Sequence, residues 1–319
     1  MTADFAAAVT TLIGRPLRDD EDFGVAVSGG PDSLALLLLA HRAFGSRVCA
    51  LTVDHGLRAA AAVEAQTVAD HAAALGVRHV TLRWEGPRPA ANLQAAARAA
   101  RYRLMGAWCA ANGVRWLATA HHRDDQAETL LLRLARGSGS GGLAGIRARR
   151  PLAACVELLR PLRAKTRADL ASLVAAAGWI AADDPSNRAM RFDRTRARAL
   201  LAATPWLDPA RLAASAAHLA EAEAALVWTA DVAWRGRAAV TAIGATIDAG
   251  GLPREIARRL LLRAIGELAP ARAPRGPAVD RLLDRLASGG GGTLGGVNAR
   301  ARGTGDATIW HISIAAPRR

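Results

Sequence analysis

Short apolar runs alternate with longer alanine- and leucine-rich segments through the first part of the chain. Four of these runs are FGVAVS from residue 23, RVCALTVD from residue 47, VRHVTLRW from residue 77 and VRWLATA from residue 114. Each segment between two runs is long enough for a helix that crosses over a sheet. Because the runs are continuously apolar, they predict parallel strands with helices on both faces, which is a doubly wound α/β fold.

Polar residues collect where these predicted strands end. SGGPDS (28–33) follows the first strand, DHGLR (54–58) follows the second, and HHRDDQAET (121–129) follows the fourth. In such a sheet, ligands bind beyond the carboxyl ends of the strands, at the loops that lead into the next helix. The pattern therefore predicts that three separate loops converge on one functional site.

The pattern changes after the fourth predicted strand. The stretch RGSGSGGLAG (136–145) is too rich in glycine to continue a helix, and it predicts a covering loop or hinge. Residues 146–163 predict a short extended pair, and Thr166 is the expected N-cap of the next helix.

Beyond about residue 205 the chain is predicted to be mostly helical. The expected helices cover 208–237, 253–268 and 277–287, and a strand-like ATIWHISI closes the sequence. We therefore expect a catalytic domain over residues 1–205. A smaller, mainly helical domain over residues 206–319 is expected to end in a short glycine-rich and strand segment. Three tryptophans of this domain are predicted to be core residues rather than platforms for base stacking, because they fall in helical segments with apolar neighbours. They are Trp206, Trp228 and Trp234.

The composition fits a globular protein. With 319 residues, of which 51% are hydrophobic, the chain can bury the cores of two ordinary domains. No apolar stretch approaches the roughly 20 residues that cross a bilayer, so we expect a cytoplasmic protein that binds no membrane. The three cysteines, Cys49, Cys109 and Cys155, form no CxxC pair and are expected to be reduced, half-buried core residues.

Charge is distributed unevenly along the chain. The formal net charge is +14, and Lys165 is the only lysine. Residues 1–140 hold 15 basic and 13 acidic residues, whereas residues 141–319 hold 27 and 15. A strongly basic second part predicts that a polyanion is gripped mainly there.

The loop SGGPDS is typical of a phosphate site. Its glycines allow positive φ and close backbone approach, and its N–H groups and the following helix N-terminus attract an anion. Pro31 suits the first helical turn, where a missing N–H costs nothing. Asp32 cannot bind phosphate without a cation, so it implies Mg²⁺ or a positive substrate group nearby. The alternative is a turn that merely links strand to helix, and the glycine–lysine pair of a Walker loop is absent.

The loop HHRDDQAET places acidic residues on one helix face. Asp125, Glu128 and Thr129 stand at i, i+3 and i+4, and His121 precedes them at the end of the strand. A clustered acidic face at the ligand edge of a phosphate-binding fold requires cations. The alternative, an acidic first turn that complements the helix dipole, leaves the paired histidines unexplained.

These motifs resemble a known family. SGGxDS between a strand and a helix is similar to the signature of the N-type ATP pyrophosphatases, or PP-loop enzymes, which cleave ATP to AMP and pyrophosphate. The other motifs follow the order and spacing found in the tRNA(Ile)-lysidine synthases within that class. They are VDHGLR (53–58), NLQAAARAARY (92–102), the stretch 118–145, RPL (160–162) and DDPSN (183–187).

The resemblance implies a fold and a reaction. The fold is that of the adenine nucleotide alpha hydrolases. The reaction ligates free L-lysine to C2 of the wobble cytidine in tRNA(Ile) with a CAU anticodon, with ATP as co-substrate and Mg²⁺ as cofactor. The carbonyl oxygen of the cytidine first attacks the α-phosphate, and the lysine amine then expels AMP. The oligomeric state is left open, with a homodimer as one expectation.

The resemblance also assigns candidate residues. The expected ATP-binding residues are Ser28, Gly29, Gly30, Pro31, Asp32, Ser33 and His55. The expected catalytic residues are Asp32, Arg101, His121, Asp125 and Glu128, with Asp32 as the Mg²⁺ ligand. Asp32 and Asp125 are candidates for holding lysine or magnesium, and His121 and Arg101 for stabilising phosphate charge or moving a proton. Arg196 and Arg198 are expected to contact tRNA or substrate, although Thr195 stands where the family usually has asparagine. The mainly helical domain over residues 206–319 is expected to bind the tRNA.

Three other functions remain as alternatives. A tRNA cytidine thiolase of the same class generally needs a cysteine pair or an iron–sulfur cluster, and this chain has no CxxC. An NAD or GMP synthetase would leave the basic second part and the VDHGLR motif unexplained. A non-enzymatic RNA-binding protein would have no use for the intact SGGPDS loop and acidic cluster.

Overall fold

The computed structural model describes residues 1–56, 60–86, 89, 91–182, 193–270, 274, 276–303 and 305–315. The chain forms two compact units, Met1–Ala220 and Glu221–Arg319. The division falls inside helix α9 (Pro209–Arg237), whereas the sequence pattern places it near residue 205. The first turns of α9 group with the first unit because the fully buried Ala216 lies against Gly145.

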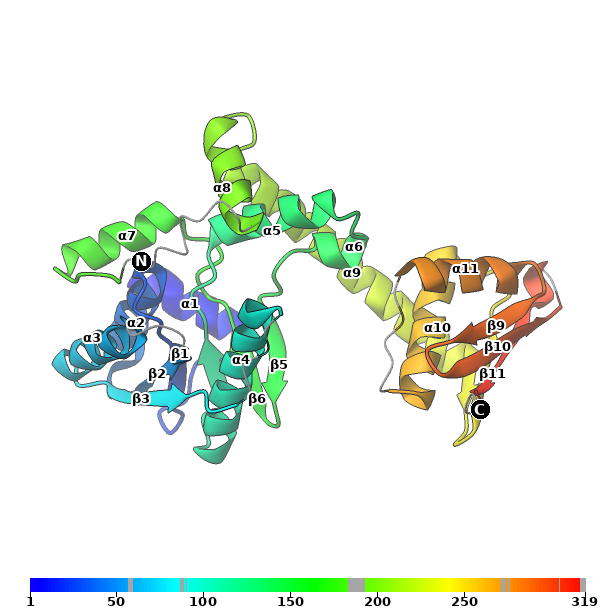
Figure 1. Cartoon of the computed structure of the whole chain (residues 1–319), viewed down its shortest axis with the longest axis horizontal. Helices are drawn as coiled ribbons and strands as arrows, with labels where there is room; N and C mark the ends of the chain where they lie inside the picture. Colours follow the sequence, from blue (N-terminus) through cyan, green and yellow to red (C-terminus); the bar gives the residue numbers. More distant parts are fainter. Residues whose placement is uncertain are drawn as a thin grey trace. The chain divides into compact units, whose positions relative to one another are not determined.

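The first unit is built on a six-stranded sheet in the order β3-β2-β1-β4-β6-β5 (Figure 1). Its strands are β1 (Phe23–Ala26), β2 (Val48–Asp54), β3 (Arg78–Arg83), β4 (Trp116–Ala118), β5 (Arg149–Ala153) and β6 (Val156–Leu159). All neighbours are parallel except β5 and β6, which form the predicted extended pair. The strand order reverses between β1 and β4, so a crevice opens at their carboxyl ends.

Helices cover both faces of this sheet, with α1 (Thr2–Ile13), α2 (Pro31–Phe44), α3 (Ala60–Ala74) and α7 (Arg167–Ala176) on one face and α4 (Leu93–Ala111) on the other. The unit also contains α5 (Arg123–Ala135), α6 (Ser140–Leu143) and α8 (Asp193–Ala203), of which α6 and α8 pack against α5, and a 3₁₀ turn at Gly45–Arg47. Val48 and Ala50 of β2 pack with α1, α2, α3 and α7, whereas Cys49 and Leu51 pack with α4. The doubly wound prediction is confirmed. Within the described ranges, no helix is long and apolar enough to span a membrane.

The glycine-rich stretch after α5 is held by one buried side chain. The Gln126 side-chain oxygen accepts a hydrogen bond from the Ile146 N–H at 2.6 Å, and its amide donates to the Ile146 carbonyl at 3.0 Å. Gly145 has φ +72°, and a Cβ there would lie 2.6 Å from the Gln126 oxygen. Glycine is therefore required at this position, and Gln126 fixes the return of the chain toward β5.

The second unit contains more strands than the sequence pattern predicts. Its helices α10 (Arg254–Leu268) and α11 (Gly276–Ala287) match two predicted segments, and α9 matches the third. A five-stranded antiparallel sheet accompanies them in the order β7-β8-β11-β10-β9. Its strands are β7 (Ala238–Val240), β8 (Gly244–Asp248), β9 (Gly291–Leu294), β10 (Val297–Arg302) and β11 (Ile309–Ile314), with a 3₁₀ turn at Gly305–Ala307. Only β11 is rich in β-branched and aromatic residues, which is why it alone was predicted.

Two of the three tryptophans expected in the core are exposed. Trp206 and Trp228 are 78% and 67% exposed, and only Trp234 is buried. Helix α9 buries a single stripe in the core of the second unit, which includes Leu226 and Trp234. Trp228 lies off that stripe, so an apolar neighbourhood in sequence did not determine its burial.

The cysteines also differ from their expected half-buried state. Cys49 and Cys109 are fully buried, and Cys155 is exposed in the turn between β5 and β6, with φ +57°. All three are free thiols.

We expect Gln126→Ala to lower the free energy of unfolding by about 2 kcal/mol, because it leaves the Ile146 backbone groups without their partner. Gln66→Ala is the matched control, since Gln66 hydrogen-bonds Asp70 on the exposed side of α3; it should cost less than about 0.5 kcal/mol. Denaturant unfolding of both variants measures the difference. Equal losses in the two variants would contradict a structural role for Gln126.

Candidate active site

A cavity of about 1090 Å³ lies at the carboxyl ends of β1, β2 and β4. The three loops expected to converge all contribute to its lining, with Ser33 from the first, His55 from the second and His121 from the third. Helices α4 and α8 add Arg101 and Arg198. The cavity therefore stands at the point where the strand order reverses.

The loop 28–33 is folded by its own hydroxyl groups. The Ser33 hydroxyl accepts a hydrogen bond from the Ser28 N–H at 3.1 Å and donates to the Gly30 carbonyl at 2.9 Å. Gly29 has φ +84°, and α2 begins directly afterwards at Pro31. The backbone is thus arranged as an anion cradle at a helix N-terminus, in the absence of any lysine.

One buried histidine links three carboxylates beside this cradle. His122, the N-cap of α5, is 1% exposed. Its Nε2 lies 3.4 Å from an oxygen of Asp32 and 3.7 Å from one of Asp125, and its Nδ1 lies 3.4 Å from Asp124. The sequence analysis assigned no role to His122 or Asp124. The adjacent acidic pair after two histidines was the available signal, but it did not indicate which histidine turns inward.

The protonation of this cluster follows from its contacts. Burial alone would lower the pKa of His122, but the carboxylates of Asp124, Asp32 and Asp125 close to its ring raise it to about 9. The pKa of Asp124 is lowered to about 2, first by His122 and further by the Arg167 N–H, which donates at 2.7 Å. His122 is therefore a cation at neutral pH and neutralises part of the acidic cluster.

Two of these carboxylates face the cavity. Asp32 and Asp125 line it, whereas Asp124 does not. Asp125 also accepts the His122 backbone N–H at 3.1 Å, which fixes its orientation. One buried oxygen of Asp32, Oδ1, has no hydrogen-bond partner among the residues that the structure describes. The acidic corner, Asp32 and Asp125, thus retains acceptor capacity for a cation.

Another part of the cavity is cationic. Arg98, Arg101, Arg194 and Arg198 line it. Burial and the charges of Arg98 and Arg194 lower the pKa of Arg101. Arg98 donates to the Tyr102 hydroxyl at 3.2 Å and lies over its ring. Guanidinium groups held this close together favour a bound polyanion.

His121 lies within this cationic wall as a neutral imidazole. Burial and the nearby guanidinium groups, Arg160 and Arg98 foremost, lower its pKa well below the usual value. Its Nε2 lies 3.5 Å from Arg98, which can only donate, and its Nδ1 lies 2.9 Å from the Thr119 hydroxyl. The Nδ1 atom therefore carries the proton, and Nε2 offers a lone pair.

Glu128 does not face the ligand site, although the sequence pattern predicted that it would lie there with Asp125. It is 1% exposed and does not line the cavity. One oxygen accepts from both Arg167 and Arg198 at 3.0 Å. Glu128 therefore holds two cavity arginines from α7 and α8, whereas Asp125 on the same helix faces the cavity.

Most of the site residues predicted from the sequence line the cavity, but Gly29 and Arg196 do not. Ser28, Gly30, Pro31 and His55 line the cavity, as do Ser33, Asp32, Arg101, His121, Asp125 and Arg198. Gly29 does not line it, although its φ shapes the loop. Arg196 is exposed and also does not line it, because it stands two residues from both Arg194 and Arg198 on one helix. The motif DDPSN, with Leu57 and Arg58 of VDHGLR, lies outside the described residues.

The arrangement suits phosphate chemistry with a cationic second substrate. The cradle and the cationic wall can bind a triphosphate or a nucleic-acid backbone, and the acidic corner can bind an ammonium group or a metal ion.

Comparisons with known proteins agree with this chemistry. Residues 1–204 match the model of the PP-loop domain family. The chain is 45% identical to the tRNA(Ile)-lysidine synthase of Novosphingobium aromaticivorans, over 92% of this chain and 89% of that protein. It is 42% identical to the enzyme of the same name from Zymomonas mobilis, over 89% of this chain and 87% of that protein.

A solved structure resembles the fold at low sequence identity. The U34-tRNA thiolase NcsA of Methanococcus maripaludis, solved with its [4Fe-4S] cluster, matches with a TM-score of 0.56 and 16% identity. The match covers 69% of this chain and 79% of that chain, and it shows a shared fold alone. The matched PP-loop domain and the identity to curated relatives over most of their length show that this chain belongs to the tRNA(Ile)-lysidine synthase family.

Proposed function

We propose that this protein ligates free L-lysine to C2 of the wobble cytidine in tRNA(Ile) with a CAU anticodon, giving lysidine and changing decoding from AUG to AUA. The observation that carries the proposal is one cavity that combines an anion cradle, a cationic wall and an acidic corner. This combination matches a reaction that joins a nucleotide, an RNA and an amine, and membership of the family supports ATP, tRNA(Ile) and lysine as these three substrates.

The first step activates the cytidine. Its C2 carbonyl oxygen attacks the α-phosphate of ATP, the bond to the β-phosphate breaks, and pyrophosphate leaves. The N–H groups of Gly29, Gly30 and Asp32 bind phosphate oxygens, since Pro31 has no N–H and those of Ser28 and Ser33 are bonded within the loop. Arg98 and Arg101 stabilise the charge that develops on those oxygens. His55, beside Asp54 at the end of β2, is the candidate contact for the adenosine.

The second step transfers lysine. The ε-amine attacks C2, and the phosphate ester formed in the first step leaves as AMP, because the carbonyl oxygen has become a good leaving group. Asp32 and Asp125 are suited to hold the lysine ammonium, since both face the cavity beside the cradle. The amine must lose a proton before it attacks C2, and His121 is a weak acceptor for it, because burial and nearby guanidinium groups hold its pKa well below the usual value.

The cavity also fits Mg²⁺ bound together with ATP. Mg²⁺ in such sites takes one or two carboxylates plus phosphate oxygens, and Asp32 offers a buried oxygen without a hydrogen-bond partner among the described residues. The ion would neutralise phosphate charge during pyrophosphate release. Asp32 would then hold the ion, and Asp125 would hold the lysine ammonium.

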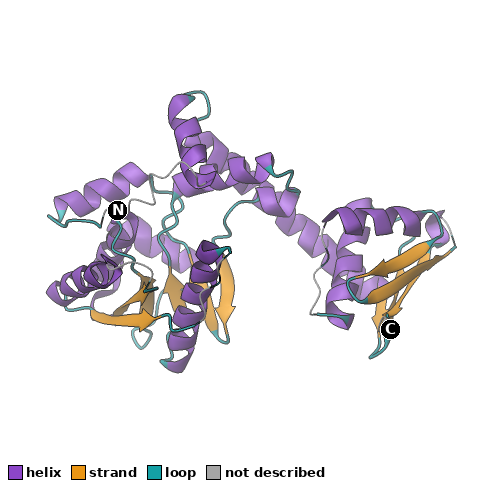
Figure 2. Ribbon diagram, viewed as in Figure 1, coloured by secondary structure: helices purple, strands orange, loops and turns teal. Residues whose placement is uncertain are grey.

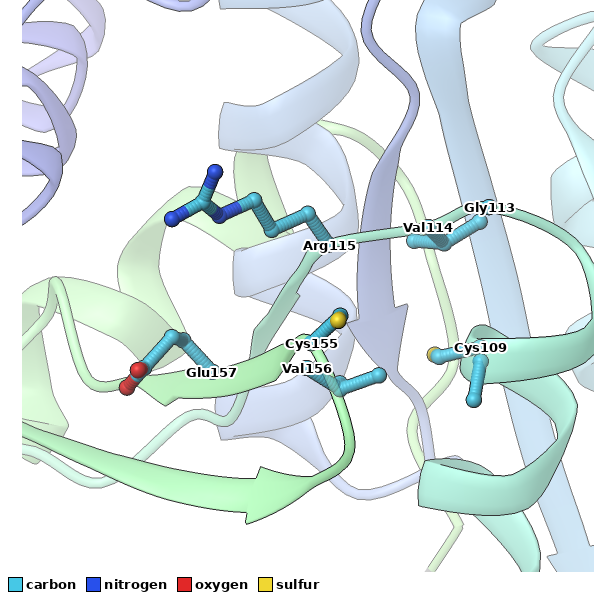
Figure 3. Close-up of a pocket in the computed structure, with 8 residues that line it drawn as sticks. Cys109, Gly113, Val114, Arg115, Cys155, Val156 and Glu157 are labelled. Atoms are coloured by element: carbon cyan, nitrogen blue, oxygen red, sulfur yellow. The ribbon is translucent and has the colours of Figure 1, made fainter.

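A sulfur-transfer function is less well supported. Cys109 and Cys155 line a separate cavity of about 260 Å³, beside Val114 and Val156 (Figure 3). That cavity lies at the amino ends of β4 and β6, at the opposite edge of the sheet from the candidate active site. None of the three cysteines lines the large cavity.

The tRNA partner agrees with the charge distribution. Residues 147–198 carry 12 basic and 5 acidic residues, an excess suited to an anticodon stem, and Arg194 and Arg198 from this segment line the cavity. We propose that the enzyme acts on tRNA in the cytoplasm. A homodimer is also proposed, and light scattering would measure its molecular mass.

Incubation with CAU-anticodon tRNA(Ile), labelled lysine, ATP and Mg²⁺ should place label in the RNA and release pyrophosphate in equal amounts. A tRNA carrying a different wobble base is the control and should stay unlabelled. Folded protein that binds the tRNA yet transfers no lysine would contradict the proposed function.

Asp125→Asn should reduce the kcat/KM of lysine transfer by at least about 100-fold, because it removes one charge of the acidic corner. The asparagine oxygen can still accept the His122 N–H, so the helix cap is retained. Asp70→Asn makes the same change on the exposed side of α3 and should leave activity unaltered. A raised Kd for tRNA with kcat and the KM for lysine unchanged in Asp125→Asn would show that the acidic corner has been misassigned.

A further inference from the structure

The peptide between Gly29 and Gly30 is held from outside its own loop. The Gly29 carbonyl accepts a hydrogen bond from the Ala182 N–H at 2.9 Å. The Gly30 carbonyl is instead bonded within the loop, by the hydroxyl and the N–H of Ser33. Ala182 belongs to a short segment after α7, residues 178–182, which we call the strap; Figure 2 shows it leaving the end of that helix. The strap therefore complements the hydroxyl groups in fixing the cradle.

The direction of the Gly29 carbonyl determines where the Gly30 N–H points. In a trans peptide, the C=O of one residue and the N–H of the next point in opposite directions. Among the described residues no peptide bond is cis, so the Gly30 N–H is directed away from the strap. Gly30 lines the cavity, whereas Gly29 does not. The hydrogen bond from Ala182 thus keeps the Gly30 N–H available to a phosphate oxygen.

The two glycines make this orientation easy to lose. Gly29 has φ +84°, and glycine tolerates the dihedral angles on both sides of a rotated peptide plane. After such a rotation, the Gly29 carbonyl would take the place of the Gly30 N–H, and its oxygen would repel an anion. The glycines that allow a phosphate to approach closely therefore require a hydrogen bond from elsewhere to stay in the binding orientation.

The position of the strap is set by Trp179. Helix α7 ends with Gly178 in the left-handed conformation, φ +70°, which turns the chain back at this point. The Trp179 ring then stacks on the His71 ring of α3, with centroids 4.2 Å apart and an angle of 15° between the planes. Trp179 also packs against the main core of the first unit. Because Ala182 follows only three residues later, the packing of this ring fixes the reach of the Ala182 N–H.

Helix α3 supports the cradle as well as the strap. A Cβ on Gly29 would lie 3.6 Å from Cγ2 of Val68 and 3.5 Å from Cβ of Ala182. The glycine backbone is therefore enclosed between α3 and the strap. Val68 and His71 stand at i and i+3, on one face of α3. That face thus contacts both the cradle and the ring that positions the strap.

We propose that the Ala182 N–H holds the Gly29–Gly30 peptide in the orientation that binds a nucleotide phosphate, and that Trp179 is a positioning residue for this contact. The identity of the nucleotide as ATP rests on the proposed function. Trp179 does not line the cavity, so it acts through the strap. The affinity for phosphate groups thereby depends on a residue outside the site.

Ala182→Pro removes the N–H that holds the Gly29 carbonyl. It should raise the Kd of ATP at least about 10-fold, because the Gly30 N–H loses its fixed direction toward a charged oxygen. The Kd of adenosine, which has no phosphate, should change less than about twofold. Calorimetric titration with each ligand, without tRNA or lysine, measures the two affinities.

Variants of Trp179 test the same contact through the stacked ring. Trp179→Ala should raise the Kd of ATP at least about threefold and retain the affinity for adenosine, because the binding orientation of the peptide becomes less populated. Trp179→Phe keeps a ring on His71 and should restore most of the ATP affinity. Ile180→Ala is the matched control, because Ile180 lies in the same strap and is 83% exposed; it should bind both ligands as the wild-type protein does.

Two outcomes would overturn the inference. One is unchanged ATP affinity in folded Ala182→Pro. The other is an equal loss of ATP and adenosine affinity in Trp179→Ala, which would show that the strap supports the fold alone. If Ala182→Pro does not fold, the comparison of Trp179→Ala with Trp179→Phe decides. A selective loss of ATP affinity supports the inference even if the wild-type protein makes no lysidine, so failure of the proposed function is distinguished from failure of the inference.

Discussion

The buried contact between His122 and three carboxylates is the interaction on which the site depends. Asp32 comes from the loop after β1, whereas Asp124 and Asp125 belong to the first turn after β4. An unpaired cluster of this kind would be costly to bury, because like charges repel and desolvation disfavours each of them. One imidazolium cation compensates for part of that charge and joins the two loops that flank the crevice.

This compensation leaves the cavity with charge of both signs. Asp124 is committed to His122 and the start of α7, and Glu128 is committed to Arg167 and Arg198. Asp32 and Asp125 remain directed to the cavity, near guanidinium groups that include Arg101. A reaction between a polyanion and a cationic amine requires both kinds of surface in one enclosure, and the strand-order reversal brings them together.

The fold and the location of the site could be predicted from the sequence because both depend on local patterns. Continuous apolar runs identified β1 to β4, and the polar loops after three of them line one cavity. The direction of individual side chains could not be predicted in the same way. Glu128 and Asp125 share a helix face, yet Glu128 pairs with Arg167 and Arg198 whereas Asp125 faces the cavity, because α8 packs against α5.

The pairing of strands in the second unit also could not be predicted from the sequence. Strands β7 to β10 carry glycine or alanine where strands usually carry β-branched or aromatic residues, so the alternation in VNARAR of β10 was not distinguished from a loop. Their register nevertheless determines which arginines of the second unit share a face. The helices of that unit were predictable because α10 and α11 repeat buried residues at helical spacing, such as Leu282 and Leu286.

If one cavity performs activation and transfer in sequence, an adenylated tRNA forms before lysine is bound. Incubation of the protein with CAU-anticodon tRNA(Ile) and ATP labelled at the α-phosphate, without lysine, detects this intermediate. Label should accumulate in the tRNA and be released as AMP when unlabelled lysine is added. Absence of labelled tRNA before lysine is added, combined with normal lysidine formation afterwards, would contradict an adenylated intermediate.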